Sequence, residues 1–243
     1  MLDKNSSQPL YEQIKRYILS RIESGEYIAH QQLPSERQLS DQFDVSRLTV
    51  SKAIKQLVQD GWLYVQIGKG TYIGEEPIQQ QIDMLTSFTE DMKIRGQNTT
   101  SRILHASVKP ASEEVAIALT IPQGTPIVEL ERVRLVSQIP MAIERASVIA
   151  DRCPDILDHH DFSSESLYAV LRENYHVLLV SAEQVFEARA ATKDESKLLN
   201  ISIGAPVLAI HRITYDEMNQ ACEHVKSVYR GDRYKFRAKL SRI

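Results

Sequence analysis

One stretch of the sequence recurs at a constant offset of 80 residues: residues 118–134 (ALTIPQGTPIVELERVR) align with residues 198–214 (LLNISIGAPVLAIHRIT). In each copy an acidic helical segment leads through Gly-x-Pro into a long alternating strand. A second strand then returns, over 140–150 in the first copy and 221–229 in the second. Two such units can share one antiparallel sheet with helices on a face. The repeat therefore predicts an α+β domain over residues 84–243.

Between the two copies, residues 164–175 have a helical pattern and residues 177–190 form a long strand pattern. Residues 75–83 are polar, carry a proline and have little to bury. We expect them to link the α+β domain to a separate domain at 1–74.

The composition excludes several classes of protein. The chain has 243 residues, of which 42% are hydrophobic, and its apolar runs are far too short to span a bilayer. The polar N-terminus has no apolar core of a signal peptide. Cys153 and Cys222 are isolated, which argues against a disulfide scaffold or a zinc cluster and favours a reducing cytoplasm. We expect a cytoplasmic protein without a membrane partner, a metal or a cofactor.

Three helices are predicted in the first domain. The first has apolar residues at helical spacing after Pro9 and stops at Gly25. The second opens with a capping box at Ser35. The third is capped by Ser46 and ends at Gly61.

Residues 65–73, VQIGKGTYI, are compatible with a phosphate-binding loop, an ordinary hairpin turn or a tip that touches nucleic acid. A phosphate loop needs a helix directly after it, and no helix begins at Thr71. The runs 62–67 and 71–73 are β-branched and aromatic and flank Gly68–Gly70, which predicts a hairpin. Three helices and a hairpin are the winged-helix order.

These motifs resemble those of the GntR superfamily of transcription regulators. The segments PLYEQIKRYILSRIESGEY, LPSERQLSDQF, VSRLTVSKAIKQLVQDGWL and GKGTYI are similar to its winged helix-turn-helix domain. The segments LTSFTEDMKIRG, ERVRL, IPMAIERA, SESLYAVL and EHVKSVYRGDRYKF resemble the effector-binding (UTRA) domain of its HutC branch, which has a chorismate-lyase-like fold. Within the branch, the motifs most resemble repressors of N-acetylglucosamine utilisation, a group that responds to phosphorylated amino sugars.

The resemblance implies a homodimer that binds a pseudo-palindromic double-stranded DNA operator, with one recognition helix in each half-site. Arg37 and Arg47 match groove-facing arginines, each able to discriminate a guanine by roughly 1–3 kcal/mol. Arg37 has an alternative partner in Asp41, one helical turn along the chain. The expected DNA-binding residues are Ser35, Arg37, Ser46, Arg47, Thr49, Ser51, Lys52, Gly68, Lys69, Gly70 and Thr71.

Two features distinguish this chain from the general pattern of DNA-binding domains. Ser51 stands where the family has arginine, which removes one strong base contact, and Lys52 points about 100° further round the helix. Residues 1–76 contain 9 Lys and Arg against 10 Asp and Glu. The absence of a basic excess predicts modest nonspecific affinity for DNA.

Arg132 and Arg134 suggest the location of a ligand site in the second domain. They lie two residues apart on a predicted strand and so share one face, and in the repeat they align with Arg212 and Thr214. Two guanidinium groups on one face repel each other unless an anion or a carboxylate lies between them. One interpretation is a structural salt bridge to Glu144, and the other is a bidentate site for a phosphate or carboxylate.

The family resemblance adds residues to the ligand site. Helix starts near Ser87 and near Ser164 and Ser166 favour anions, and Glu144, Glu223 and Tyr229 match positions that would bind sugar hydroxyls or an amino group. A sugar phosphate fits such a site, as do other acidic metabolites. The expected effector-binding residues are Ser87, Phe88, Thr89, Arg132, Arg134, Glu144, Ser164, Ser166, Tyr168, Glu223 and Tyr229.

The sequence thus predicts a repressor of sugar or amino-sugar utilisation genes, released from its operator by a small anionic effector such as glucosamine 6-phosphate or N-acetylglucosamine 6-phosphate. The alternative is a regulator that responds to another acidic metabolite. A lyase-like enzyme is a distant alternative suggested by the fold relative. We expect no enzyme, because no catalytic triad or CxxC is present and His159–Asp161 lacks metal-ligand spacing.

Overall fold

The computed structural model describes residues 2–4, 6, 8–66, 68–74 and 78–240. They form two compact units, Met1–Ile78 and Gln79–Ile243. Ile67 of the predicted hairpin, residues 75–77 of the predicted linker and the extreme ends of both predicted domains lie outside the described residues. No helix within the described ranges is both long enough and apolar enough to cross a bilayer.

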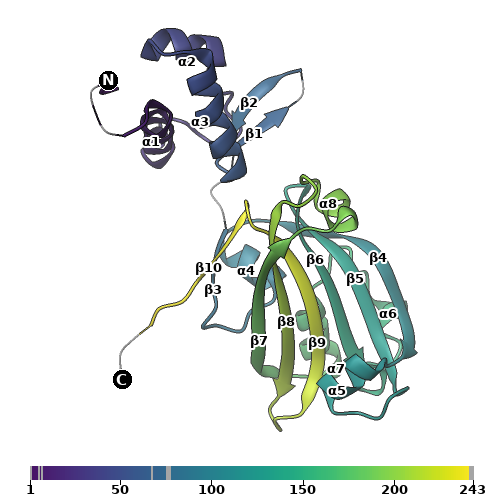
Figure 1. The fold of residues 1–243 in the computed structure, drawn as a ribbon. Coiled ribbons are helices and arrows are strands. Elements are labelled where there is room, and N and C mark those ends of the chain that lie inside the picture. The colour runs from purple at the N-terminus through teal and green to yellow at the C-terminus, as the bar shows by residue number, and fades with distance from the viewer. Residues whose placement is uncertain (1, 5, 7, 67, 75–77, 241–243) are drawn as a thin grey trace. The chain divides into compact units, whose positions relative to one another are not determined.

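The first unit has the predicted winged-helix order (Figure 1). Ser35 accepts a hydrogen bond from the amide of Gln38, whose side chain accepts one from the Ser35 amide, so the predicted capping box is present. Ser46 caps the third helix by accepting from the amide of Thr49. The elements are α1 (Leu10–Glu23), α2 (Glu36–Phe43), α3 (Arg47–Gln59), β1 (Leu63–Gln66) and β2 (Gly70–Ile73).

A single apolar core holds these helices and the hairpin together. Apolar side chains at helical spacing from all three helices meet Leu63 of β1 and Ile73 of β2, both of which are buried. Each fully buried Leu or Ile side chain contributes about 1.5–3 kcal/mol by removing apolar surface from water. The hairpin is thereby fixed to the helices by its own side chains.

The segment 30–33 pairs with the free edge of β2, which the sequence did not reveal. The amide of Leu33 donates to the carbonyl of Thr71 (2.8 Å), and the amide of Ile73 donates to the carbonyl of Gln31 (2.8 Å). The hairpin therefore has backbone partners on both sides of its second strand, which limits its movement.

The second unit is built on a six-stranded antiparallel sheet with the strand order β4-β5-β6-β9-β8-β7, and it confirms the predicted α+β fold. Its elements are β3 (Ile78–Gln81), α4 (Phe88–Ile94), β4 (Thr99–Pro110), α5 (Glu113–Leu119), β5 (Pro126–Val136), β6 (Ile139–Ile149), η1 (Ala150–Arg152), α6 (Ile156–His159), α7 (Leu167–Tyr175), β7 (Leu179–Ala190), α8 (Lys193–Leu199), β8 (Pro206–Asp216), β9 (Ala221–Arg230) and β10 (Tyr234–Arg237).

The strand order reads the same from both edges, because each half of the sheet comes from one copy of the repeat. The first copy runs α4-β4-α5-β5-β6 and the second runs α7-β7-α8-β8-β9. The repeat therefore extends beyond the predicted helix and hairpin to a preceding helix and strand in each copy. A pseudo-two-fold axis passes between β6 and β9, the innermost strands.

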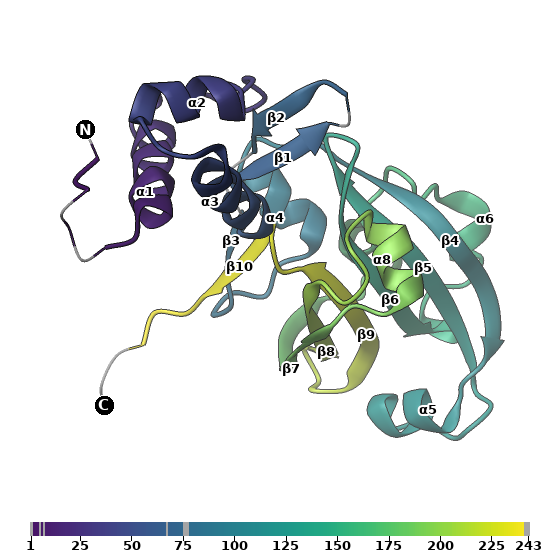
Figure 2. The same ribbon diagram turned by 45° about the horizontal axis from the view of Figure 1, so that its top comes forward.

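The helices lie on both faces of this sheet. On the outer face α5 packs on β9 and α8 packs on β6, so each helix covers the last strand of the other copy. Figures 1 and 2 show these two helices toward opposite ends of the strands. On the inner face, α6 and α7 bury Ile156, Leu167 and Leu171 against β5, β6 and β9.

A small two-stranded sheet joins the beginning of the second unit to its end. β3 pairs with β10, and the amide of Ile82 donates to the carbonyl of Arg237 (3.0 Å). β3 lies within residues 75–83, where the sequence predicted only a linker. A strand pairing between segments more than 150 residues apart leaves no local pattern in either segment.

Candidate DNA-binding surface and effector pocket

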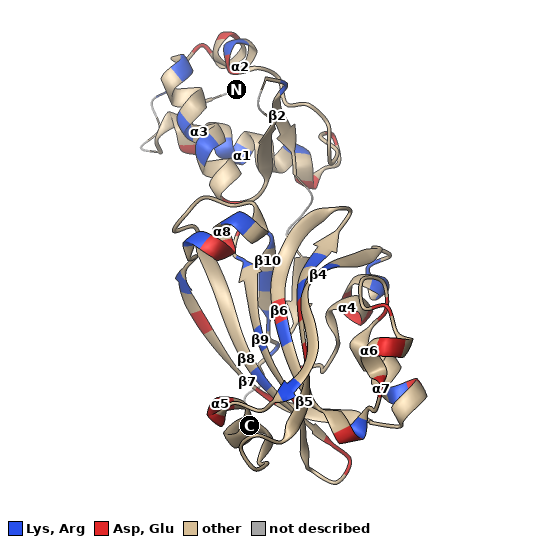
Figure 3. Ribbon diagram, turned by 90° about the vertical axis from the view of Figure 1, so that its right-hand side faces the viewer, with Lys and Arg blue, Asp and Glu red and all other residues tan. Residues whose placement is uncertain are grey.

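The N-terminal turns of α3 present the side chains expected to contact DNA. Arg47 is exposed, and the Ser46 and Thr49 hydroxyl groups lie 2.8 Å apart and bond to each other. Arg37 on α2 is exposed and forms no ion pair with Asp41 or with any other residue in the described ranges. Both arginines are therefore free to donate to a ligand. Figure 3 marks basic positions on α1, α2 and α3.

Leu48 is a feature of this surface that the sequence reasoning missed. Its side chain is 83% exposed between Arg47 and Thr49, although leucines at helical spacing are usually core residues. An exposed apolar group beside hydrogen-bonding groups can contact the methyl group of thymine in the major groove. Helical periodicity alone predicts this exposure, because Leu48 does not lie on the buried face of α3 that Val50, Ala53 and Leu57 form.

Lys52 and Ser51 are less available than expected. The Lys52 ammonium group lies 3.8 Å from the centre of the Tyr11 ring, in a cation–π contact within the first unit. Ser51 is half-buried. A phosphate contact by Lys52 therefore requires it to leave the Tyr11 ring.

The wing tip is held in shape by backbone and side-chain hydrogen bonds. The Lys69 amide donates to the carbonyl of Gln66 (2.9 Å), and the Gln32 side chain donates to the carbonyl of Lys69 (2.8 Å). Gly70 has φ of +120°, and a Cβ there would lie 2.7 Å from the Gln32 side-chain nitrogen, so glycine is required. Gly68, Lys69 and Gly70 are exposed and Thr71 is half-buried.

A pocket lies on the inner face of the six-stranded sheet, close to the pseudo-two-fold axis. It encloses about 520 Å³ of space free of protein atoms, including its open mouth. The space between the side chains is narrow, so a ligand the size of a sugar phosphate must push some of them outward. The lining residues are Thr86, Ser87, Phe88, Thr89, Arg132, Arg134, Glu144, Ser166, Leu167, Tyr168, Ile210, Arg212, Glu223, Val225, Ser227 and Tyr229.

The pocket brings together all predicted effector residues except Ser164. Helix α7 begins at Leu167 with Ser166 as its cap, later than predicted, and Ser164 is exposed and bonds to the carbonyl of Asp161. Asp161 accepts several hydrogen bonds in this segment, which makes a turn there instead of a first helical turn. Ser164 therefore lies outside the pocket.

Arg132 and Arg134 are each 3% exposed and share one carboxylate. Arg132 donates to Glu144, directly opposite it on β6, and Arg134 lies 3.9 Å from the same oxygen. Arg134 also donates to the hydroxyl group of Thr89 (2.7 Å), and its guanidinium lies 4.9 Å from the centre of the Phe88 ring. The salt-bridge interpretation is thus correct for Glu144, but one carboxylate cannot satisfy two guanidinium groups.

Several hydrogen-bond donors of these arginines have no partner within the described part of the chain. Arg132 Nε and Nη1 and Arg134 Nε are buried and unpaired. A buried donor without a partner costs about 1–3 kcal/mol, and more for a charged group. Burial, followed by repulsion from Arg132, lowers the pKa of Arg134 to about 10. Burial opposes ionisation of Glu144, yet Arg132 and Arg134 hold its pKa below 4.5.

The opposite wall of the pocket carries a buried acid without a salt bridge. Glu223 is 1% exposed and accepts hydrogen bonds from the hydroxyl groups of Tyr168 (2.8 Å) and Thr214 (2.9 Å). Burial raises its pKa, an effect that these two hydrogen bonds partly offset. Burial also raises the pKa of Tyr229 to about 12, so that phenol is a neutral hydrogen-bond donor and acceptor.

Arg212 is a pocket residue that sequence reasoning missed. Its guanidinium donates to Gln184 (3.0 and 3.2 Å) and to the carbonyl of Thr86 (3.5 Å). The alignment of Arg212 with Arg132 in the repeat is the sequence signal that could have found it. The described lining residues include three arginines and two glutamates. Their summed charge is therefore positive even when both acids are ionised.

Two family descriptions match the two units. The description "Bacterial regulatory proteins, gntR family" matches residues 10–73, and "UTRA domain" matches residues 95–235, more than half of the chain. The chain belongs to the gntR family of bacterial regulatory proteins. The family and fold predicted from the sequence motifs are therefore confirmed, and the second unit is a UTRA domain.

Relatives of this gntR-family chain match it along its whole length. The "HTH-type transcriptional repressor NagR" of Bacillus subtilis (strain 168) is 39% identical and covers 100% of this chain and 99% of its own length. A "Histidine utilization repressor" of Pseudomonas aeruginosa is 31% identical and covers 96% of this chain and 92% of its own length. The crystal structure of PhnF from Mycobacterium smegmatis superposes with a TM-score of 0.67 at 28% identity, covering 94% and 99%.

These similarities decide between a regulator and an enzyme. The matching families are a DNA-binding regulator and its UTRA domain, and the relatives from Bacillus subtilis and Pseudomonas aeruginosa described above are both named as repressors. The expectation that this gntR-family member is a regulator and not an enzyme is confirmed.

Proposed function

We propose that this protein is a homodimeric transcriptional repressor of sugar or amino-sugar utilisation genes, and that a small phosphorylated effector releases it from a pseudo-palindromic operator. Glucosamine 6-phosphate and N-acetylglucosamine 6-phosphate are the effectors that we favour. The proposal combines the family resemblance with the chemistry of the pocket in the UTRA domain.

The pairing of Arg132 and Arg134 with one carboxylate is the observation that carries the proposal. Their unpaired N–H groups are buried, so any anion that enters gains hydrogen bonds that the protein alone does not make. A phosphate offers several oxygens that accept such bonds. Guanidinium groups bind phosphate bidentately and are weakly hydrated, which suits a buried site.

Glu223 supports an effector with a hydrogen-bond donor as well as an anionic group. Its buried carboxylate has accepted two hydroxyl hydrogen bonds and has no cation bonded to it in the described chain. An ammonium group, an amide N–H or a sugar hydroxyl can donate to it. A phosphorylated amino sugar has both groups on one small ring.

Other acidic metabolites are the second candidate class. A relative named for histidine utilisation is 31% identical over nearly the whole chain, so family membership alone does not select a sugar phosphate. A carboxylate on the effector would satisfy Arg132 and Arg134 in the same manner as a phosphate.

A thermal-shift screen of the full chain separates these candidates. With either hexosamine phosphate at about 100 times its dissociation constant, we expect the melting temperature to rise by about 5–10 °C. Unphosphorylated glucosamine should have no effect, because it lacks the anionic group. A rise with histidine or citrate but with neither hexosamine phosphate would contradict the amino-sugar proposal.

We propose that DNA is bound by α2, α3 and the wing, with Arg37 and Arg47 at base edges, Ser46 and Thr49 at phosphates or base edges, and Lys69 at the minor groove or its phosphates. Arg47→Ala should weaken binding to a duplex selected by the protein from a random pool by roughly tenfold or more in a mobility-shift assay. The first unit should still melt as in the wild type, because Arg47 is exposed. Unchanged affinity would mean that α3 does not read bases.

We propose residues 1–74 as the DNA-binding domain, 84–243 as the effector domain and 75–83 as the linker, with residues 74–86 as the connection through which the effector acts. Ser87–Thr89 of the pocket directly follow this connection in the chain, so a ligand that reorders them acts close to it. Hydrogen exchange of residues 78–89 with and without effector tests this route, and equal protection in both states would exclude it.

A further inference from the structure

Three side chains of the types that bind metal ions converge on the outer face of the sheet, away from the effector pocket. Glu114 comes from the first turn of α5, His211 from β8 and His224 from β9. Their ligand atoms all lie within 4.8 Å of one another. Arg212 and Glu223, the chain neighbours of the two histidines, line the pocket, so the histidines point to the opposite side of the same strands.

The strand register explains why the two imidazoles meet. His224 pairs with Ile213 and His211 pairs with Lys226, so the histidines are diagonal neighbours on one face of two adjacent strands. Helix α5 packs on β9 and brings Glu114 over them. Three separate elements therefore hold the three ligands in place.

His224 is the buried member of this cluster, while Glu114 and His211 are exposed. His224 is 6% exposed, and neither of its ring nitrogens has a hydrogen-bond partner among the described residues. An imidazole nitrogen without a partner is available to coordinate a metal ion.

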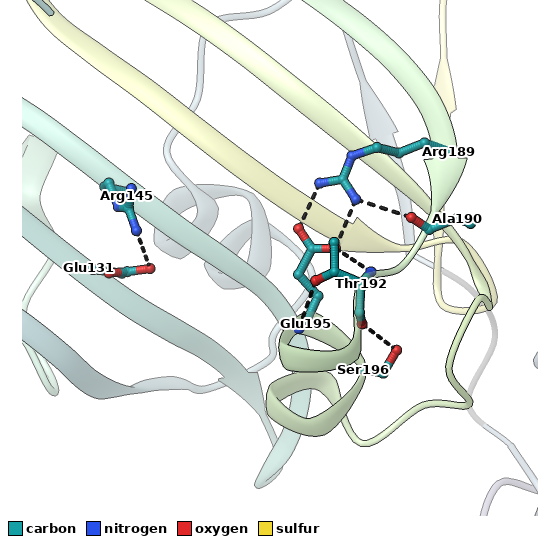
Figure 4. A network of polar contacts seen from close by, with 7 residues as sticks. All are labelled: Glu131, Arg145, Arg189, Ala190, Thr192, Glu195 and Ser196. Carbon is teal, nitrogen blue, oxygen red and sulfur yellow. Dashed lines mark hydrogen bonds and ion pairs between the residues drawn. The ribbon is translucent and has the colours of Figure 1, made fainter.

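The first copy of the repeat shows that the sheet does not need these histidines. The offset of 80 residues places Glu131 at the position of His211. It also aligns Ile213, the strand partner of His224, with Val133, the strand partner of Ile143, so Ile143 is the equivalent of His224. Ile143 belongs to the apolar core, and Glu131 pairs with Arg145 at 3.0 Å, as Figure 4 shows. The second copy therefore has two imidazoles where the first copy has an acid and an apolar residue.

Helix α8 of the second copy packs on β6 of the first copy, the place equivalent to that of α5 on β9. Figure 4 shows α8 capped by Thr192 and Glu195, with Arg189 bound to Glu195 through two hydrogen bonds of 2.6 and 2.7 Å. These contacts fix the helix without any histidine. The packing of a helix on this face therefore does not account for the imidazoles under α5.

We propose that Glu114, His211 and His224 bind a divalent transition-metal ion, and that Zn²⁺ is the ion that this ligand set suits best. Two imidazoles and one carboxylate are a known three-ligand set for Zn²⁺, with bonds of about 2.0–2.2 Å. Tetrahedral geometry requires ligand atoms roughly 3.4 Å apart, so no pair of ligand atoms has to close by more than about 1.4 Å on binding. The ion would tie α5 of the first copy to β8 and β9 of the second.

Lys226 is the competitor of the metal ion. Its ammonium group forms an ion pair with Glu114 beside the two histidines. An incoming cation is repelled by this group and must share or take over the carboxylate. Removing the lysine charge should therefore strengthen metal binding, which a merely structural cluster does not predict.

The test is a titration of the metal-free full chain with Zn²⁺ in competition with a chromophoric chelator. We expect one Zn²⁺ per chain in the wild type. His211→Ala should weaken its binding by more than about 100-fold, since loss of outer partners alone costs 10–100-fold. Lys226→Gln should strengthen binding by roughly fivefold, the effect of one nearby charge in water. Arg145→Gln, at the equivalent place in the first copy, should change nothing.

The side chains of His211 and Lys226 are both at least partly exposed, so the variants at these positions should fold. Their melting temperatures check this. The proposal is wrong if no Zn²⁺ binds in one-to-one ratio, or if His211→Ala binds it as the wild type does. It is equally wrong if Lys226→Gln leaves the affinity unchanged, or if the bound ion is lost from the double variant His159→Ala/His160→Ala instead.

Discussion

The two copies of the repeat in the UTRA domain share a framework but differ in the chemistry that they bring to the pocket. Both open with a serine-capped helix, Ser87 for α4 and Ser166 for α7, and both contribute an arginine, Arg132 and Arg212, at the equivalent strand position. The first copy then adds Arg134, where the second has Thr214. A symmetric sheet thus encloses an asymmetric site.

The carboxylates are distributed between the copies in the same asymmetric manner. The strand registers align Glu144 of the first copy with Val225, and Glu223 of the second copy with Ala142. Glu144 lies between two arginines, while Glu223 lies among hydroxyl groups. The two copies thus share a frame but differ at a few inner-face positions, so that the first copy contributes two arginines and Glu144 and the second contributes one arginine and Glu223.

The largest expected effect follows from removing the carboxylate shared by the arginines. Glu144→Gln leaves Arg132 and Arg134 buried without an anion and should reduce the free energy of unfolding by about 3–5 kcal/mol. A bound phosphate should restore part of this loss, so the melting shift with glucosamine 6-phosphate should exceed that of the wild type. Equal stability of variant and wild type in urea unfolding would show that the ion pair is not needed.

Making the first copy resemble the second at position 134 should strongly weaken effector binding. Arg134→Thr deletes a buried guanidinium that we propose to bind the phosphate, a loss of about 2–5 kcal/mol, or at least roughly 30-fold in affinity. Isothermal titration with glucosamine 6-phosphate measures it. Arg145→Thr, which removes an arginine of the same copy from the outer face, is the control and should bind as the wild type does.

The two glutamates should give opposite dependences of stability on pH. The folded pKa of Glu223 is raised above 4.5, so its contribution to stability is lost as pH rises from 4.5 through the folded pKa. The folded pKa of Glu144 is lowered, so its contribution is lost as pH falls from 4.5 through the folded pKa. Urea unfolding measures the free energy of unfolding of each variant relative to the wild type. For Glu223→Gln this relative stability should rise as pH increases above 4.5. For Glu144→Gln the loss of stability relative to the wild type should shrink as pH falls below 4.5. Parallel curves would contradict these assignments.

The smallest effect is expected at the arginine that both copies share. Arg212→Lys keeps the charge but loses the two hydrogen bonds to Gln184, and should weaken effector binding by roughly fivefold, corresponding to about 1 kcal/mol. Isothermal titration compares it directly with Arg134→Thr. A larger loss for Arg212→Lys than for Arg134→Thr would move the anion site to the second copy.

Local patterns in the sequence were sufficient for most of the fold. Capping at Ser35 and Ser46, helical spacing and the glycine hairpin predicted the winged helix, because each depends on neighbours within a few residues. The offset repeat predicted the shared sheet and placed Arg132, Arg134 and Glu144 on one face through simple alternation. Family resemblance, not spacing, supplied Tyr168, Glu223 and Tyr229.

What the sequence could not predict depends on contacts between distant segments. The pairing of β3 with β10 joins the two ends of the domain, and segment 30–33 joins β2 without a strand pattern of its own. The helix after Ser164 starts late because Asp161 competes for the same backbone groups. The cluster of Glu114, His211 and His224 needs the strand register and the packing of α5, which no linear motif encodes.

A crystal structure of the full chain with glucosamine 6-phosphate tests the central claim most directly. We predict that the phosphate oxygens accept hydrogen bonds from Arg132 and Arg134, including the nitrogens that have no partner in the protein itself, while the amino group faces Glu223. A phosphate bound at Arg212 alone, or outside the pocket with Arg134 still bonded only to Thr89 and Glu144, would contradict the assignment of the anion site to the first copy.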